Sequence, residues 1–532
     1  MTRHGITWIC GVLNYLLWWG SDTQLSSEPV LVTEYYIPTP NFGPVVASQV
    51  LFQEVIENSW GHDFVRSYNP PDVDFDHVKF YLQFDSFGRQ YDRLAHIYLD
   101  DVEVWRPSTP EPGNLSAITS SFTKDMSFAL PLLSSPRKLT VQLNNIMNDV
   151  YTGHFNTTLT AFYYKTGDSK VQIQESSWYA EEPPTEIKAV SPLLSFPTNE
   201  ELVVNKLSQD TVRAVLQVHA SGNAGEEFWY MKYSGDGGAT RLVEVYVDGR
   251  LAGYADPFPQ IYTGGFEPRL WTPIMGLRTF DVPAYYIDIT PFLPRLWDSD
   301  TPIGIRVGNG YSQKQIGKDW LISVALLTWE EPGAQGTGGT HQTYRKDSPQ
   351  IVQLPTTQII QVSHTLRNSA DLLLHGKSYY VESAQTVSHS SVLEDSRILA
   401  FDAEGRSTFV KTNSKELTSD SFSREHGYAL ALTLATDQIT LAQTYEVGID
   451  QAGGKYKVVA GHNGTWGGQN ETGVCLGSYF DKHPTYAHSV RAVNREIVSE
   501  TDQSCDNTPT LINNKGTGIY QAAEDGFKAR MP

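Results

Sequence analysis

Short runs of alternating hydrophobic and polar residues dominate the chain. From Val78 to Phe84 every second residue is a large hydrophobic one, and the three valines between residues 243 and 247 alternate with more polar neighbours. Side chains in a β-strand point alternately to its two sides, so this spacing predicts strands with one buried face. Asp248-Gly249 then supplies a tight hairpin turn. Helical periodicity is hard to find, so the sequence predicts an all-β protein of sandwiches or barrels.

An internal similarity indicates tandem domains. The segment from Arg93 to Asp101 aligns without a gap on the segment from Arg241 to Gly249. Their separation is about one domain length, which favours tandem jelly-roll-like sandwiches, although two similar strands can also coincide by chance. A run rich in Gly and Thr is typical of a flexible linker. We therefore expect a signal segment at 1–26, jelly-roll domains at 27–190 and 191–332, a linker at 333–342 and a third β-rich domain at 343–532.

Composition limits the classes of partner. The 532 residues are enough for about three domains, and 40% of them are hydrophobic, as in a globular protein. The net charge is -20 and the pI is about 5.1. Such a charge repels phosphate backbones, so we expect no nucleic-acid partner.

The beginning of the sequence predicts export. Arg3 and His4 precede an apolar run from Ile6 to Trp19, which is typical of a signal peptide and short for a membrane span; an uncleaved anchor and a buried first strand are the alternatives. With the signal removed, we expect no stable membrane association. We predict a glycoprotein that is secreted or resides in the secretory pathway or vacuolar lumen. Its Asn-x-Ser/Thr sequons are at Asn114, Asn156, Asn463 and Asn470.

Cysteine is sparse. Cys10 lies in the signal segment, so Cys475 and Cys505 are the only thiols of the expected mature chain. In an exported protein such a pair predicts one disulfide, with two buried free thiols as the alternative. No Cys-x-x-Cys pair or His-Glu-x-x-His sequence is present, so the sequence predicts no metal site.

Carboxylates beside aromatic residues are the best candidates for chemistry. Asp92 stands where the second copy of the repeat has Thr240, so the hairpin itself does not require an acid there. Glu226 and Glu227 precede a run of three aromatic residues. Adjacent carboxylates and an apolar wall both raise a pKa, as acid/base catalysis requires. The alternatives are a surface ion pair between Asp92 and Arg93 and an exposed acidic turn at 226–227.

Several blocks of the sequence resemble the peptide:N-glycanase A family of plants and fungi. The blocks span about residues 35 to 330 and keep the same order as in that family. They include Gly88-Arg89-Gln90-Tyr91-Asp92-Arg93-Leu94, Ser108-Thr109-Pro110-Glu111-Pro112, Glu227-Phe228-Trp229-Tyr230 and the long block from Pro257 to Leu293.

The resemblance implies an amidase that acts on N-glycopeptides without a metal or another cofactor. Members of the family convert the glycosylated Asn to Asp and release a glycosylamine that then loses ammonia. A fainter resemblance to the bacterial peptide:N-glycanase, which has two jelly rolls, places the catalytic carboxylates at Asp92 and Glu227.

Residues near these carboxylates are candidates for supporting and substrate-binding roles. Arg93 would hold Asp92 ionised or stabilise an oxyanion, and Glu226 flanks the second catalytic carboxylate. Trp229 and Trp271 would stack on sugar rings, with ordinary core packing as the alternative. The ligand-anchoring Arg of the bacterial enzyme falls near Arg269, and its second glutamate has no confident match in this chain.

Two other classes of function remain open from the sequence. A carbohydrate-binding module on a jelly-roll frame explains the aromatic residues and the strand pattern without catalysis. An endo-acting glycoside hydrolase also uses paired carboxylates, but it leaves a sugar attached to Asn.

Overall fold

The all-β prediction is confirmed in a computed structural model of the chain. The structure describes residues 30–504 except 33, 35–41, 114, 116, 167–182, 313–315, 317–318, 340, 396, 414, 417, 436, 452–453, 468–469 and 481–482. Helices in this part of the chain are short, and none is long and apolar enough to cross a membrane. They are η2 (Ser127–Ala129), α2 (Leu130–Leu133), η4 (Ala224–Glu226), η5 (Trp229–Met231), η6 (Ser234–Asp236), η7 (Pro268–Trp271), η8 (Thr290–Phe292) and α3 (Leu293–Asp298).

The first sandwich packs a five-stranded sheet against a four-stranded one. Burial alternates strictly along β4, as the spacing of its hydrophobic residues predicts. The larger sheet has the order β1 (Val30–Val32), β7 (Ala117–Asp125), β4 (His77–Phe87), β9 (Phe155–Tyr164) and β2 (Val45–Ile56). The smaller sheet has the order β3 (Phe64–Tyr68), β8 (Arg137–Leu143), β5 (Ala95–Leu99) and β6 (Val102–Trp105).

The second sandwich packs two four-stranded sheets. The β13–β14 hairpin turns at Asp248 and Gly249, which both have positive φ, as this turn requires. It occupies the same place in its sheet as β5–β6 does in the first sandwich, in agreement with the repeat in the sequence. The strand orders are β10 (Glu186–Phe196), β17 (Trp320–Glu330), β12 (Thr211–Gly222), β15 (Ala284–Asp288), and β11 (Leu202–Val204), β16 (Thr301–Gly308), β13 (Leu242–Val247), β14 (Arg250–Ala255).

A buried arginine joins the two sandwiches. Arg106 follows β6, is fully buried, and pairs with Glu103 through two hydrogen bonds of 2.8 and 2.7 Å. It also donates to Ser221 Oγ on β12 and to the Leu321 carbonyl on β17, both at 2.9 Å. A charge that is buried and fully hydrogen-bonded in this way fixes the orientation of one sandwich on the other.

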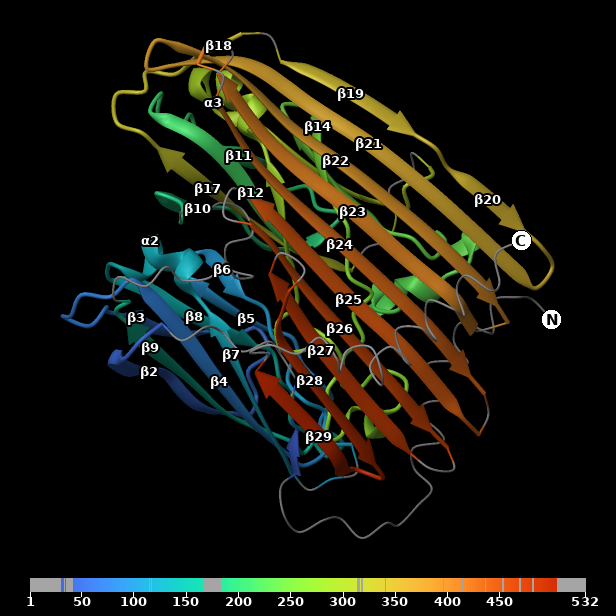
Figure 1. The fold of residues 1–532 in the computed structure, drawn as a ribbon. Helices are drawn as coiled ribbons and strands as arrows, with labels where there is room; N and C mark the ends of the chain where they lie inside the picture. The colour runs from blue at the N-terminus through green and yellow to red at the C-terminus, as the bar shows by residue number, and fades with distance from the viewer. Residues whose placement is uncertain are drawn as a thin grey trace.

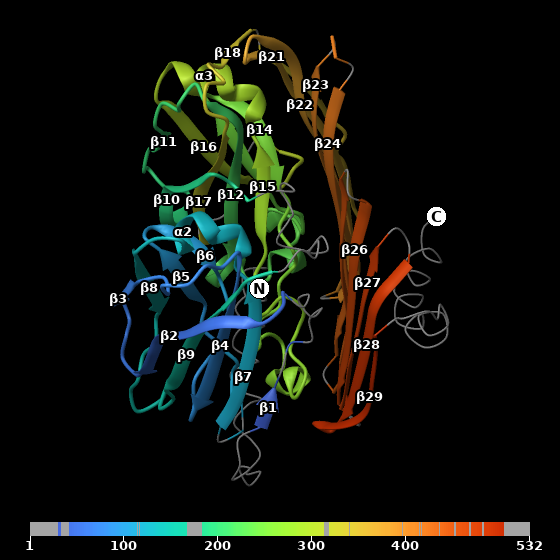
Figure 2. The same ribbon diagram turned by 60° about the vertical axis from the view of Figure 1, so that its left-hand side comes forward.

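The third part of the chain is a single twelve-stranded antiparallel sheet, called the long sheet below. It stands beside both sandwiches as one layer (Figures 1 and 2). Burial alternates along β21 and β22, so one face packs inward and the other faces outward. Its strands are β18 (Thr337–Gly338), β19 (Gln342–Asp347), β20 (Gln350–Gln353), β21 (Thr357–Leu374), β22 (Lys377–Glu394), β23 (Arg397–Asn413), β24 (Thr418–Leu434), β25 (Ile439–Gln451), β26 (Gly454–Trp466), β27 (Glu471–Phe480), β28 (His483–Val493) and β29 (Glu496–Ser504).

Several expectations fall on residues outside the described part. The signal segment, Asn114 and Cys505 all lie there, so export and the disulfide of Cys475 stay predictions. The other sequons lie on β9 (Asn156), on β26 (Asn463) and between β26 and β27 (Asn470). Thr337–Gly338, inside the expected linker, pair with β21.

Candidate active site

Three carboxyl groups from separate loops meet at the junction of the two sandwiches. Asp92 lies between β4 and β5, Glu111 lies between β6 and β7, and Glu227 directly follows η4 in the second sandwich. Glu111 is only 5% exposed, and the charge of Asp92 acts on both Glu111 and Glu227. The fold therefore gathers acids that are far apart in the sequence.

Gly264 links these acids to the connection between β14 and β15. Its backbone N–H donates to Asp92 Oδ2 at 2.9 Å. A Cβ atom at position 264 would lie 2.2 Å from Glu111 Oε2 and 3.1 Å from Asp92 Oδ1. Only glycine allows the backbone to approach both carboxyl groups this closely. The connection thus supplies a hydrogen-bond donor to the first candidate catalytic carboxylate.

Burial and mutual repulsion raise the pKa values of these acids. Burial raises the pKa of Glu227 to about 8, and the nearby charge of Asp92 adds to the effect. Burial, with Asp92 and Glu227 as neighbouring charges, raises the pKa of Glu111 well above its usual range. The pKa of Asp92 is also raised by burial, against the opposing effects of the Gly264 N–H and the Arg93 charge. Acids with different surroundings can take different protonation states at one pH.

Arg93 influences Asp92 through its charge. Among the described contacts its guanidinium donates to Gln90 Oε1 at 2.7 Å and lies 5.8 Å from the centre of the Tyr91 ring. Its backbone N–H donates to Thr109 Oγ1, and its carbonyl accepts from the Thr109 N–H. In place of the surface ion pair that was the alternative for Asp92 and Arg93, the structure has a cation anchored beside the acid cluster.

Glu226 has a different environment from Glu227. It is 2% exposed and accepts hydrogen bonds from Arg241 Nε at 2.6 Å and from Trp320 Nε1 at 2.9 Å, and it pairs with Lys232. These partners outweigh burial and hold the pKa of Glu226 below its usual range. The expected repulsion between the adjacent glutamates is wrong, because cations neutralise Glu226 and the charge that raises the pKa of Glu227 is that of Asp92.

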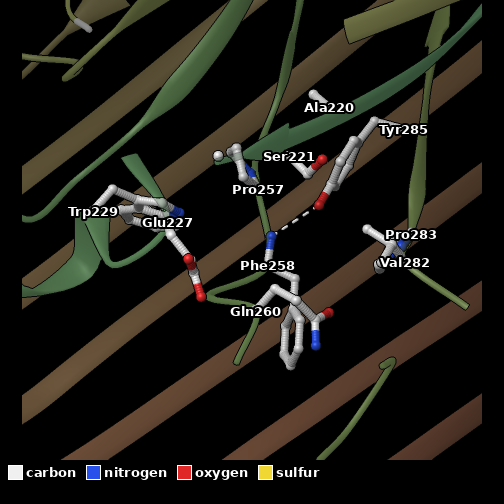
Figure 3. Close-up of a pocket in the computed structure, with 11 residues that line it drawn as sticks. Ala220, Ser221, Glu227, Trp229, Pro257, Phe258, Gln260, Val282, Pro283 and Tyr285 are labelled. Atoms are coloured by element: carbon white, nitrogen blue, oxygen red, sulfur yellow. Dashed lines mark hydrogen bonds between the residues drawn. The ribbon is translucent and has the colours of Figure 1, made fainter. Parts of the chain in front are cut away.

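A pocket beside Glu227 is lined by residues of the second sandwich and of the connection between β14 and β15. Figure 3 shows Glu227 and Trp229 on one side of the pocket and Tyr285 on the other, with strands of the long sheet behind them. The Tyr285 hydroxyl accepts a hydrogen bond of 2.8 Å from the Phe258 N–H. The remaining lining residues are Ala220, Ser221, Gly222, Pro257, Gln260, Val282 and Pro283.

The structure corrects the role expected for the two tryptophans. Trp229 is 2% exposed and packs against Trp320 and Phe401, although one edge lines the pocket. Trp271 is fully buried, donates to the Gly265 carbonyl at 2.8 Å and contacts the His462 ring. Since protein atoms cover both rings, core packing replaces the expected stacking on sugars.

Arg269 lies outside the acid cluster. Its guanidinium donates to Glu267 at 2.6 and 2.9 Å and lies 4.9 Å from the centre of the Trp466 ring on β26. This packing ties η7 to the long sheet. The expected ligand-anchoring role of Arg269 is not supported by its position.

Sequence reasoning missed Glu111 and Gly264 as parts of the site. Glu111 stands between prolines in a block that was noted only for its family resemblance. A carboxylate flanked by prolines in a loop was the signal available, because such a loop has little freedom to turn the acid away. Within the described residues, no group of three or more His, Cys, Asp or Glu side chains is arranged to hold a metal ion.

Comparison with known proteins adds independent findings. The family model described as peptide N-acetyl-beta-D-glucosaminyl asparaginase amidase A matches residues 37–347. A peptide-N4-(N-acetyl-beta-glucosaminyl)asparagine amidase A from Prunus dulcis is 29% identical over an alignment of 286 residues that covers 47% of this chain and 48% of that protein. The chain thus matches about half the length of this curated relative.

The solved structures that this chain matches include PNGase F, a glycosylasparaginase from Flavobacterium meningosepticum. It is 14% identical to this chain, with a TM-score of 0.35, and the match covers 53% of this chain and 96% of that one.

Proposed function

Since the chain belongs to the peptide N-acetyl-beta-D-glucosaminyl asparaginase amidase A family, we propose that it is a glycopeptide amidase. Its substrates are N-glycopeptides or N-glycoproteins, and it hydrolyses the side-chain amide that joins Asn to the proximal GlcNAc. The products are Asp and a glycosylamine, which then loses ammonia. The observation that carries this proposal is the meeting of Asp92, Glu111 and Glu227, of which Glu227 lines a pocket.

Amide hydrolysis needs a base and an acid in the same site. Asp92 polarises a water molecule and accepts its proton while the water oxygen forms a bond to the Asn side-chain carbon. Glu227 donates a proton to the nitrogen as the carbon–nitrogen bond breaks, so the sugar leaves as a neutral amine. The pKa of Glu227, raised to about 8, keeps that proton in place at acidic and neutral pH.

Two neighbouring groups support Asp92 in this role. The Gly264 N–H donates to its carboxylate, which favours the ionised form and fixes its orientation. The Arg93 charge opposes the effect of burial on the same group and can stabilise an oxyanion at the substrate carbonyl. Glu111, which stays protonated, can donate a hydrogen bond to the substrate.

The reaction is tested with a defined N-glycopeptide at pH 5 and mass spectrometry of both products. The amidase gives a peptide containing Asp and an intact free glycan. A peptide that keeps one GlcNAc would instead identify a glycoside hydrolase, and binding without turnover would identify a carbohydrate-binding module. Either result would overturn the proposal.

The site of action is proposed to be the secretory pathway, the vacuolar lumen or the cell exterior. The apolar segment near residue 10 and the four sequons support export. Expression of the full chain followed by N-terminal sequencing of the secreted product tests this. Recovery of the protein with residues 1–26 still attached would contradict it.

A further inference from the structure

Part of the candidate active site belongs to a long irregular segment. Residues 256–283, called the active-site connection below, join β14 to β15 and contain only the short η7 as regular structure. They supply the Gly264 N–H to Asp92 and the pocket residues Pro257, Phe258 and Gln260. A segment without a sheet ladder of its own needs other contacts to hold its backbone in place.

The first of these contacts is made by an aspartate, whose carboxylate is bonded to two histidines of the long sheet. Asp256 and His389 are each only 1% exposed at the side chain, and Asp256 Oδ1 lies 2.5 Å from His389 Nε2 on β22. Asp256 Oδ2 lies 2.8 Å from His426 Nε2 on β24. Both carboxylate oxygens are therefore bonded to the long sheet at the point where the active-site connection begins. Asp256, His389 and His426 are together called the Asp256 clamp below.

A glycine lets His426 reach this aspartate. Gly405 on β23 pairs with His426, and a Cβ atom at position 405 would lie 2.1 Å from His426 Cε1. The imidazole thus lies over the backbone of the neighbouring strand. Gly427 directly follows His426 in sequence. It has no such close neighbour, since its Cβ would meet only Glu446 Cβ at 3.9 Å.

Further contacts follow along the connection. Gln443 Nε2 on β25 donates to the Pro259 carbonyl at 2.7 Å, and the Gln443 side chain is fully buried. The Tyr428 and Tyr445 rings meet the Phe258 ring edge-on at 5.2 and 5.5 Å. These contacts hold the backbone only a few residues before Gly264.

We infer that the long sheet holds the active-site connection in place and that Gln443 and the Asp256 clamp are positioning residues for the Gly264 N–H. The inference rests on the proposed function, because the carboxylate that Gly264 orients is Asp92. Among the described residues, the charged or titratable groups that interact with Asp92 include Arg93, Glu111, Glu227 and Tyr262. The long sheet thus contributes to catalysis without touching the substrate.

A matched pair of substitutions tests this role. Gln443→Met removes the bond to Pro259, whereas Asn368→Leu removes equivalent bonds from β21 to the carbonyls of Leu251 and Ala252, at 3.2 and 3.1 Å. Both side chains are fully buried, so both variants lose a buried amide contact. Only the first loss lies in the active-site connection.

The experiment combines hydrogen exchange with a pH profile. In Gln443→Met we expect faster exchange in peptides from residues 256–283 and a rise of the acidic limb of kcat/KM by about one pH unit, because Asp92 loses a well-placed donor. We also expect kcat to fall about tenfold with KM nearly unchanged. Asn368→Leu should show neither effect. Equal effects in the two variants, or faster exchange with an unchanged pH profile, would overturn the inference.

A second pair of substitutions tests the same role if the Gln443→Met variant does not fold. Gly405→Ala displaces His426 from Asp256, whereas Gly427→Ala places the same methyl group at an ordinary van der Waals distance from Glu446. We expect only Gly405→Ala to repeat the exchange and pH changes, and the opposite order would refute the positioning role. A wild-type protein that releases no glycan would refute the proposed function alone, because exchange would still decide whether the sheet holds the connection.

Discussion

Replacing Glu227 with Gln should stabilise the protein at alkaline pH. A carboxyl whose pKa is raised by folding binds its proton more tightly in the folded state. The stabilising contribution of this bound proton is fully present below pH 4.5, the ordinary pKa of a glutamate. It is lost as the pH rises through about 8. The Gln side chain is neutral at every pH, so the Glu227→Gln variant does not lose this stability as the pH rises. The candidate catalytic acid is thus a source of instability above its unfolded pKa.

The size of the effect follows from the same two values. Each pKa unit corresponds to about 1.4 kcal/mol, so the change from 4.5 to about 8 sets a ceiling of about 5 kcal/mol in the free energy of unfolding. Glu227 is partly exposed, and water therefore screens part of the penalty. We expect Glu227→Gln to gain about 2 kcal/mol at pH 9 and to differ by less than about 0.5 kcal/mol at pH 4.

Urea unfolding followed by tryptophan fluorescence at both pH values measures this difference. The adjacent Glu226 is a matched control with the opposite sign, because Arg241 and Lys232 hold its pKa down. Glu226→Gln should destabilise the protein by about 3 kcal/mol at pH 9, since it leaves a buried arginine uncompensated. If Glu227→Gln gained nothing at pH 9, the description of Glu227 as a partly buried acid with a raised pKa would be refuted.

Three further predictions concern turnover of an N-glycopeptide. Asp92→Asn should reduce kcat at least about 10³-fold with an unchanged circular dichroism spectrum, and substantial residual turnover would exclude Asp92 as the base. Gly264→Ala should reduce kcat/KM about 100-fold, because its Cβ would lie 2.2 Å from Glu111 Oε2; wild-type kinetics would contradict this geometry. The wild-type profile of kcat/KM against pH should fall on its alkaline side near pH 8, where Glu227 loses its proton, and Glu227→Gln should abolish that limb.

The alternation of hydrophobic and polar residues was enough to predict the strands. It was not enough to predict that some strands are buried on both faces. The three valines of β13 are buried as predicted, yet Glu244 between them is also only 4% exposed. Arg306 on β16 pairs with Glu244, and Arg345 of β19 lies 3.9 Å from it. The long sheet covers this face, and a contact with a distant layer leaves no periodic signal in the strand itself.

The polar composition of the long sheet also gave no indication that one of its faces packs in the core. Its inward face buries polar residues such as His389, Asn368 and Gln443 together with hydrophobic ones. These residues bond to backbone and carboxylate groups of the second sandwich, which is how buried polar groups are tolerated. From sequence alone they are typical of exposed strands.

The site was predictable only in part for a related reason. Asp92 and Glu227 stood out because each acid adjoins aromatic residues in a block that resembles a known family. Glu111 and Gly264 become meaningful only when three loops converge, because what distinguishes them is a close approach of backbone to carboxylate. The exclusion of Trp271 from the site likewise depends on its contact with His462 in the long sheet.

The most direct test of the proposed chemistry is the fate of the water oxygen. A defined N-glycopeptide is incubated with the protein in oxygen-18 water near pH 5, and both products are analysed by mass spectrometry. We predict one heavy oxygen in the side-chain carboxyl of the new Asp, because the water attacks the amide carbon. Heavy oxygen bound at the sugar during cleavage, together with an unchanged Asn in the peptide, would contradict the amidase mechanism.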